Sequence, residues 1–207
     1  MFFNNKAQAV IAFFSLAFAS HFVYKHFRKK YKKAAINEVI MFSYGTTGVK
    51  RSKLSRCLIS PSMERLLYYL SSPRRSIDIC MYVMTNVELT NEILKLAIRG
   101  VRIRVIIDAD MAFSNGSSLK RLEKQGIPVR WMKSTNLMHH KFCLIDTEFD
   151  DVRCTPLVII GSLNWTTQAL NGNWENVAVT SQETLVEQYK NEFDRLWLEF
   201  KPIVDIA

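Results

Sequence analysis

The chain has 207 residues, of which 48% are hydrophobic and 23% charged, and this composition excludes a disordered chain. Its length suits one domain of ordinary size with a hydrophobic core. The formal net charge of +9 is unevenly distributed: residues 1–33 carry seven basic and no acidic side chains, residues 34–145 carry 17 basic and eight acidic ones, and residues 146–207 carry four and eleven. This basic excess favours an anionic ligand for the part of the chain before residue 146.

An uncharged, mostly apolar segment occupies residues 7–24. As a helix rising about 1.5 Å per residue it would measure about 27 Å, enough for a thin bilayer. The basic residues follow this segment, whereas a cleaved signal peptide carries its charge before the apolar stretch. A matrix transit peptide would be amphipathic and Arg-rich, and this segment is neither. A buried core helix is the remaining alternative, but the long basic flank argues against it. We therefore expect residues 1–33 to be a single-pass membrane anchor.

The basic flank also predicts the orientation of the anchor. By the positive-inside rule it places the remaining domain, residues 34–207, in the cytosol. A short, moderately hydrophobic anchor with a basic flank on its C-terminal side fits the mitochondrial outer membrane. The composition fits the endoplasmic reticulum equally well.

Strands and helices alternate over much of residues 34–207, which predicts an α/β fold with a mixed central sheet and helices on both faces. Ser62 is the expected N-cap of the first helix, Gly100 the expected end of the second, and residues 43–57 form a polar, basic loop. We expect strands at 34–42, 76–84, 101–108, 127–132, 141–145, 157–161 and 174–180, and helices at 63–70, 88–99, 117–125 and 182–200.

The four cysteines show no spacing typical of a disulfide framework or a CxxC motif. Cys80 and Cys143 lie within apolar runs, so we expect both to be buried as small hydrophobic side chains. The absence of a disulfide pattern fits a reducing compartment.

The most informative segment runs from His139 to Asp146 and has the pattern His-x-Lys-x4-Asp. Side chains alternate along an extended segment, so His139 and Lys141 are predicted to share one face and His140 to lie on the other. A histidine beside a fixed positive charge suits attack on a phosphate diester. Asp146 falls on the face opposite Lys141, so we expect it to support the site by fixing the turn or the strand.

A second segment, Gly161-Ser162-Leu163-Asn164, follows, and Glu175 comes eleven residues after Asn164. The His-x-Lys pattern alone describes many exposed strands and is a weak signal. Together with Gly-Ser-x-Asn and the glutamate it is specific. The only other histidines precede residue 34, so histidine chemistry in the domain must use His139 or His140.

This combination resembles the signature of the phospholipase D superfamily. The segments NLMHHKFCLID and IIGSLNWTTQALNGNWENV resemble the Zucchini subfamily of mitochondrial phospholipase D-like proteins, and the similarity covers roughly residues 35–200. The resemblance implies a phospholipase D-like fold and a hydrolase in which His139 forms a covalent phosphohistidine. It also implies that Lys141, Ser162 and Asn164 bind the non-bridging oxygens, and that Glu175 holds the other nitrogen of His139.

The superfamily uses two histidines per active site, one as nucleophile and one as acid, and this chain supplies one motif. The resemblance therefore implies a symmetric homodimer in which both His139 side chains meet at the two-fold axis. It implies no metal and no cofactor for catalysis.

The sequence departs from the family pattern at two places. The gap between Asp146 and Gly161 is fourteen residues rather than six, which we interpret as a lengthened, acidic hairpin tip that leaves both strands intact. Relatives also carry a zinc module of three cysteines and one histidine before the first helix. This chain has only Cys57 there, so we expect no structural zinc, which needs four ligands.

Two principal hypotheses describe the substrate. The resemblance favours a single-strand-selective endoribonuclease that cuts piRNA precursors. The basic residues Arg102 and Arg104 are candidates to bind the RNA backbone, and His140 is a candidate to support the substrate. The alternative is a phospholipase that hydrolyses cardiolipin to phosphatidic acid at the mitochondrial surface. It would need an apolar trough, to which Leu137, Met138 and Trp165 are candidates to contribute. A non-catalytic scaffold would usually show a degraded motif, and this motif is intact.

Overall fold

The computed structural model describes residues 5–30, 35–45, 48–54, 57–147 and 153–201, and the chain divides into two compact units, residues 1–34 and 35–207. The first unit contains one helix, α1 (Asn5–Lys30). Its segment Gln8–Lys25 is long and apolar enough to cross a membrane, judged by length and composition, and none of that segment is buried. The predicted N-terminal apolar helix is confirmed, and its membrane insertion stays a prediction.

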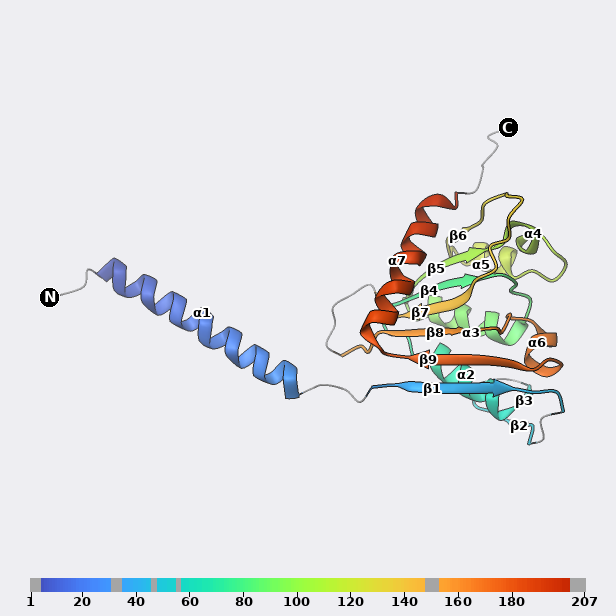
Figure 1. The fold of residues 1–207 in the computed structure, drawn as a ribbon, viewed down its shortest axis with the longest axis horizontal. Coiled ribbons are helices and arrows are strands. Elements are labelled where there is room, and N and C mark those ends of the chain that lie inside the picture. Colours follow the sequence, from blue (N-terminus) through green and yellow to red (C-terminus); the bar gives the residue numbers. More distant parts are fainter. Residues whose placement is uncertain (1–4, 31–34, 46–47, 55–56, 148–152, 202–207) are drawn as a thin grey trace. The chain divides into compact units, whose positions relative to one another are not determined.

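The second unit is built on a seven-stranded sheet with the order β1-β9-β8-β7-β4-β5-β6 (Figure 1). The strands β4, β5 and β6 run parallel to one another, and all other neighbours are antiparallel, so the predicted mixed sheet is confirmed. The strands are β1 (Asn37–Phe42), β4 (Ser76–Met81), β5 (Arg102–Ile107), β6 (Val129–Arg130), β7 (Lys141–Ile145), β8 (Leu157–Gly161) and β9 (Glu175–Thr180).

Helices cover both faces of this sheet, as predicted. One face packs against α2 (Pro61–Leu70), α3 (Val87–Ile98), α5 (Leu119–Lys124) and α6 (Thr167–Asn171), and the other packs against α7 (Glu183–Glu199). The short helix α4 (Ala109–Ala112) follows β5.

Two local predictions need correction. The N-cap of α2 is Ser60, whose Oγ accepts a hydrogen bond from the Met63 amide at 3.2 Å, because Pro61 suits the first helical position. Ser62 instead donates to the carbonyl of Met41 at 2.6 Å. The expected loop 43–57 also contributes to a small antiparallel hairpin of β2 (Lys50–Arg51) and β3 (Leu58–Ile59), whose strands are too short to show a period.

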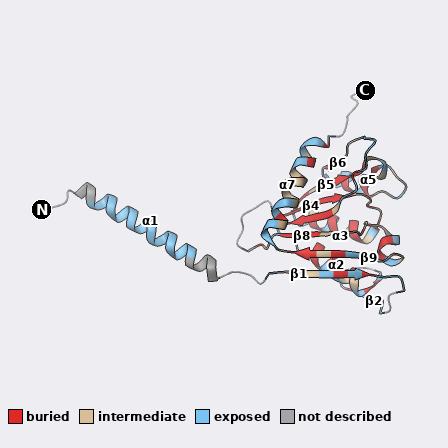
Figure 2. Cartoon of the chain, in the orientation of Figure 1, coloured by how far each residue is buried: buried red, intermediate tan, exposed pale blue. Residues whose placement is uncertain are grey.

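The core consists of two layers, one on each face of the sheet. Strand β4 is buried along its whole length because it lies in the middle of the sheet with helices on both sides, and Figure 2 shows the central strands largely buried. Cys80 and Cys143 are at most 1% exposed, as predicted, and burial raises the pKa of both thiols. None of the four cysteines, all of which lie among the described residues, forms a disulfide.

Candidate functional site

The candidate site lies where four strand ends meet. Strand β7 runs antiparallel to β4 and β8, so its first residue, Lys141, lies opposite Met81 at the end of β4. Strand β8 ends at Gly161 at the same edge, and β9 begins there with Glu175. Residues from distant parts of the sequence therefore meet at this edge of the sheet.

His139 and Lys141 are in direct contact, as the strand alternation predicts. Lys141 Nζ lies 3.2 Å from Nε2 and 3.3 Å from Nδ1 of the His139 ring, and it donates to the His139 carbonyl at 2.9 Å. The imidazole is exposed, whereas the lysine is half-buried. This is an accessible imidazole beside a cation, the arrangement that nucleophilic attack on a phosphodiester needs.

Tyr82, which the sequence reasoning missed, contacts both residues. Its ring centroid lies 4.7 Å from that of His139, and Lys141 Nζ lies 5.2 Å from the centre of the tyrosine ring. The Tyr82 amide donates to the carbonyl of His140 at 2.9 Å, which continues the β4–β7 ladder one residue beyond the strands. The predicted strand 76–84 includes Tyr82 as an ordinary strand residue. In the structure β4 ends at Met81, so Tyr82 lies just beyond the strand, at the edge that carries the site.

Both carboxylate oxygens of Glu175 are engaged, but not by His139. Ser162 Oγ donates to one oxygen, and Asn173 Nδ2 donates to the other at 2.9 Å. Ser162 Oγ in turn accepts from the Asn176 amide at 3.1 Å. Within the described part of the chain no hydrogen bond joins Glu175 to His139, so the expected contact between them is absent from this arrangement. Asn173 was not predicted, and no motif in the sequence marks it.

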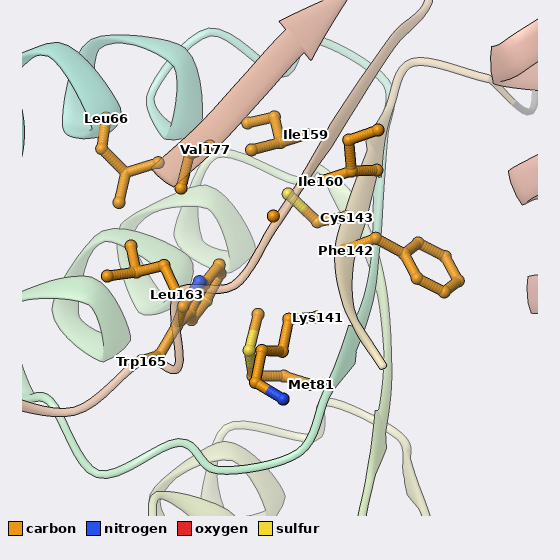
Figure 3. Close-up of a pocket in the computed structure, with 11 residues that line it drawn as sticks. Leu66, Met81, Lys141, Phe142, Cys143, Ile159, Ile160, Leu163, Trp165 and Val177 are labelled. Atoms are coloured by element: carbon orange, nitrogen blue, oxygen red, sulfur yellow. The ribbon is translucent and has the colours of Figure 1, made fainter. Parts of the chain in front are cut away.

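The pKa of Lys141 is lowered from its usual range, chiefly by burial, and the negative charge of Glu175 opposes this shift. The lysine also lines a small pocket whose other lining residues are mostly apolar. Figure 3 shows Lys141 beside Met81, with Phe142 pointing to the opposite side of β7. The other residues that line the pocket are Leu66, Cys143, Ile159, Ile160, Gly161, Leu163, Trp165 and Val177.

The Gly161 and Asn164 positions of the second motif have different physical roles. A Cβ atom on Gly161 would lie 2.1 Å from the Asn176 carbonyl oxygen, so only glycine allows β8 to approach β9 this closely. Among the described residues, Asn164 Oδ1 is buried without a hydrogen-bond partner. An amide oxygen only accepts hydrogen bonds, so this atom lacks a donor among the described residues.

His140 lies on the other face of β7, as the alternation predicts. Its Nε2 lies 3.4 Å from Glu192 Oε1 on α7, and its ring packs against Phe142 with centroids 5.6 Å apart. This placement gives His140 a contact with α7 and does not bring it to the His139–Lys141 pair.

Arg102 and Arg104 lie away from the His139–Lys141 pair, and their predicted role in binding substrate stays a prediction. Arg104 donates twice to the fully buried carboxylate of Asp78, at 2.8 Å each, and once to Asp194 of α7 at 3.0 Å. Arg102 lies opposite Ser76, at the end of the sheet away from Lys141, and its guanidinium also pairs with Asp78. Because side chains alternate along β5, Arg102 and Arg104 both lie on the face of the sheet that α7 covers.

Asp146 lies beyond the far end of β7 and is 4% exposed. Its carboxylate accepts hydrogen bonds from the amides of Arg74, Arg75 and Ser76 at distances between 2.7 and 3.1 Å. Its φ of 54° is left-handed, a conformation that aspartate tolerates in turns. These contacts fix a turn, as expected, and keep Asp146 away from Lys141.

Comparisons with known proteins agree with this geometry. Residues 66–197 match the family model described as "Cardiolipin synthase, PLD-like domain". The chain is 39% identical to the mitochondrial cardiolipin hydrolase of Chlamydomonas reinhardtii over 74% of this chain and 66% of that protein. It is 32% identical to the Drosophila melanogaster protein of the same name, over 83% of this chain and 79% of the relative. The human protein of that name is 39% identical, but the match covers only 53% of its length.

Solved structures support the fold. The phospholipase D family member Nuc from Salmonella typhimurium superposes with a TM-score of 0.63 over 80% of this chain and 97% of its own, at 21% identity. NucT from Helicobacter pylori superposes with a TM-score of 0.61 at the same identity. The family model spans more than half of the sequence and the fly relative is matched over most of its length, so the chain belongs to the phospholipase D-like family of hydrolases.

Proposed function

We propose that this protein is a membrane-anchored phosphodiesterase that hydrolyses cardiolipin to phosphatidic acid. The observation that carries the proposal is the contact of an exposed imidazole, His139, with the half-buried Lys141 at the edge where four strand ends meet. The names of the relatives make cardiolipin the leading substrate. The exposed Leu137, two residues before His139, supports a lipid ligand. Met138 and Trp165, which were also candidates for an apolar trough, are buried.

The chemistry follows from the residues at the site. A neutral His139 imidazole attacks phosphorus, a nitrogen–phosphorus bond forms, and the bond to the leaving oxygen breaks. A second, protonated imidazole gives its proton to the leaving oxygen and then accepts one from the water that displaces His139. Lys141 and the Asn164 amide stabilise the charge on the non-bridging oxygens, while Ser162 and Asn173 orient Glu175 near Lys141.

The second imidazole is the His139 of another copy of this chain. His140 is engaged with α7 and the other histidines, His21 and His26, belong to the N-terminal unit, so one chain holds one suitable imidazole at the site. A symmetric homodimer would bring two His139 side chains together, and the unpartnered Asn164 Oδ1 is consistent with a site that a single chain leaves incomplete. No metal or cofactor is part of this proposal.

The proposed location is the mitochondrial outer membrane, with residues 35–207 in the cytosol. The apolar stretch of α1, the basic residues that follow it and the mitochondrial relatives support this location.

An endoribonuclease acting on single-stranded RNA, including piRNA precursors, is the second candidate. One observation favours it: Trp174, which precedes Glu175, is 79% exposed. An exposed indole beside a phosphodiester site suits the stacking of an unpaired base.

The test uses the purified full-length chain reconstituted in vesicles, with EDTA present and with His139→Asn as the matched control. Cardiolipin vesicles and 5′-labelled single-stranded RNA are assayed in parallel. We expect release of phosphatidic acid by the wild type and none by the variant. Cleavage of RNA without cleavage of cardiolipin would overturn the lipid assignment in favour of the second candidate, and activity in the variant would overturn the mechanism.

A further inference from the structure

Tyr82 is the one aromatic residue that touches both members of the His139–Lys141 pair among the described residues. Its ring lies 4.7 Å from the His139 ring at an interplanar angle of 57°, and Lys141 Nζ lies 5.2 Å from its centre. The tyrosine backbone is fixed by the hydrogen bond from its amide to the His140 carbonyl, at 2.9 Å. A ring held by the sheet therefore lies against two side chains at the edge of the sheet.

Besides Tyr82, the His139 ring has Lys141 Nζ within hydrogen-bonding distance, and a lysine side chain is itself flexible. His139 is exposed and precedes the first residue of β7, so its imidazole is free to change rotamer unless a neighbour holds it. Nucleophilic attack requires the ring nitrogen in one position relative to phosphorus, and loss of that orientation slows the reaction without removing any reacting group.

We infer that Tyr82 is a positioning residue of the proposed active site, whose ring holds the His139 imidazole and the Lys141 ammonium group in one arrangement. The inference rests on the proposed function of this site. An aromatic contact restricts the imidazole, and the face of the ring stabilises the protonated lysine.

The ring, and not the hydroxyl, carries this role. Within the described residues the Tyr82 hydroxyl has no hydrogen-bond partner, while both contacts at the site involve the ring. Phenylalanine should therefore replace tyrosine, whereas methionine, which has a similar length but no aromatic face, should not.

Loss of the ring should also change the response to pH. The titratable groups that face Lys141 are His139 before the same strand, Tyr82 after β4 and Glu175 from β9. Burial already lowers the pKa of Lys141, and the ring favours its charged form. Without the ring, Lys141 should lose its proton at a lower pH, and the alkaline limb of the activity profile should move to lower pH.

The experiment compares Tyr82→Phe and Tyr82→Met in the full-length protein with a soluble chromogenic phosphodiester, bis-p-nitrophenyl phosphate, as substrate. We expect Tyr82→Met to lower kcat by about tenfold or more, with KM within about twofold, because orientation and not binding is lost. Its alkaline limb should shift to lower pH. Tyr82→Phe should keep kcat and the pH profile of the wild type.

Two outcomes would overturn the inference: wild-type kcat in Tyr82→Met, or equal losses in both variants. A thermal unfolding curve identifies a variant that fails to fold, in which case Tyr82→Leu takes the place of Tyr82→Met. The NMR shifts of the His139 ring protons, assigned with His139→Asn, give a readout independent of activity. The ring-current shift should persist in Tyr82→Phe and disappear in Tyr82→Met. If the wild type is inactive but the ring-current shift still depends on the aromatic ring, the proposed function is contradicted, while the contact between Tyr82 and His139 is confirmed.

Discussion

The two ends of β7 carry the two halves of one sequence motif and have opposite characters. At the first end, His139 is exposed and Lys141 is half-buried, and this burial lowers the pKa of the lysine. At the other end, Asp146 is buried and its carboxylate is saturated by three backbone amides. Lys141 and Asp146 are five residues apart, which at about 3.3 Å per residue separates them by about 17 Å. No single group of side chains can therefore contact both ends of the strand.

The comparison teaches that the spacing in His-x-Lys-x4-Asp is the length of a strand. The four residues between Lys141 and Asp146 form the rest of strand β7, and their buried side chains pack alternately into the cores on the two faces of the sheet. The His139–Lys141 end of the motif is accessible to a substrate, whereas the Asp146 end stabilises the position of the strand. Substitutions at the two ends should therefore separate activity from stability.

The largest effect is expected from His139→Asn. We expect phosphodiesterase activity to fall by about a thousandfold or more, equivalent to about 4 kcal/mol, because the nucleophile is lost. The thermal unfolding midpoint should hardly change, since the imidazole is exposed. A variant with substantial activity would show that the reactive end of β7 lies elsewhere.

Arg104→Met should lower stability by about 3 kcal/mol, because it leaves the buried carboxylate of Asp78 without its strongest partner. Urea unfolding measures this loss. The KM for cardiolipin and for RNA should stay at the wild-type value, since Arg104 lies away from the site. An increase in KM at unchanged stability would restore Arg104 as a substrate-binding residue.

Asp146→Asn should cost about 2 kcal/mol of stability, because the side chain loses the negative charge that strengthens three bonds to Oδ1, and an NH2 group replaces the Oδ2 that accepts from the Arg74 amide. The matched control is Asp110→Asn, an exposed acid on α4 that should cost less than about 0.5 kcal/mol. Activity per folded molecule should be retained. A kcat that falls while the unfolding curve is unchanged would contradict the separation of the two ends.

Glu175→Gln should reduce activity by about tenfold, or about 1.4 kcal/mol, because Ser162 and Lys141 both lose a charged neighbour. The Glu175 carboxylate raises the pKa of Lys141 against the lowering effect of burial. Without it, the lysine loses its proton at a lower pH, so the alkaline limb of the activity profile should move to lower pH. If the alkaline limb of the profile does not move, deprotonation of Lys141 does not determine the loss of activity at high pH.

The sequence predicted the sheet well because β strands such as 141–145 and 157–161 are short apolar runs bounded by polar residues. It also predicted which face His139, His140 and Lys141 occupy, since side chains alternate along a strand. It could not predict that Arg104 pairs with Asp78 and Asp194, because these partners come from other strands and helices. Tyr82 and Asn173 were missed for the same reason: their importance comes from contacts that only the fold creates.

The most direct test of the central claim, a site shared by two copies of this chain, is a mixing experiment. Wild-type and His139→Asn chains are unfolded together in equal amounts, refolded and assayed on a soluble phosphodiester. If the site needs two His139 residues, random pairing leaves about a quarter of the dimers fully wild type, and activity per wild-type chain falls to about half. Activity per wild-type chain that stays at its unmixed value would show that each chain holds a complete site, and would contradict the account.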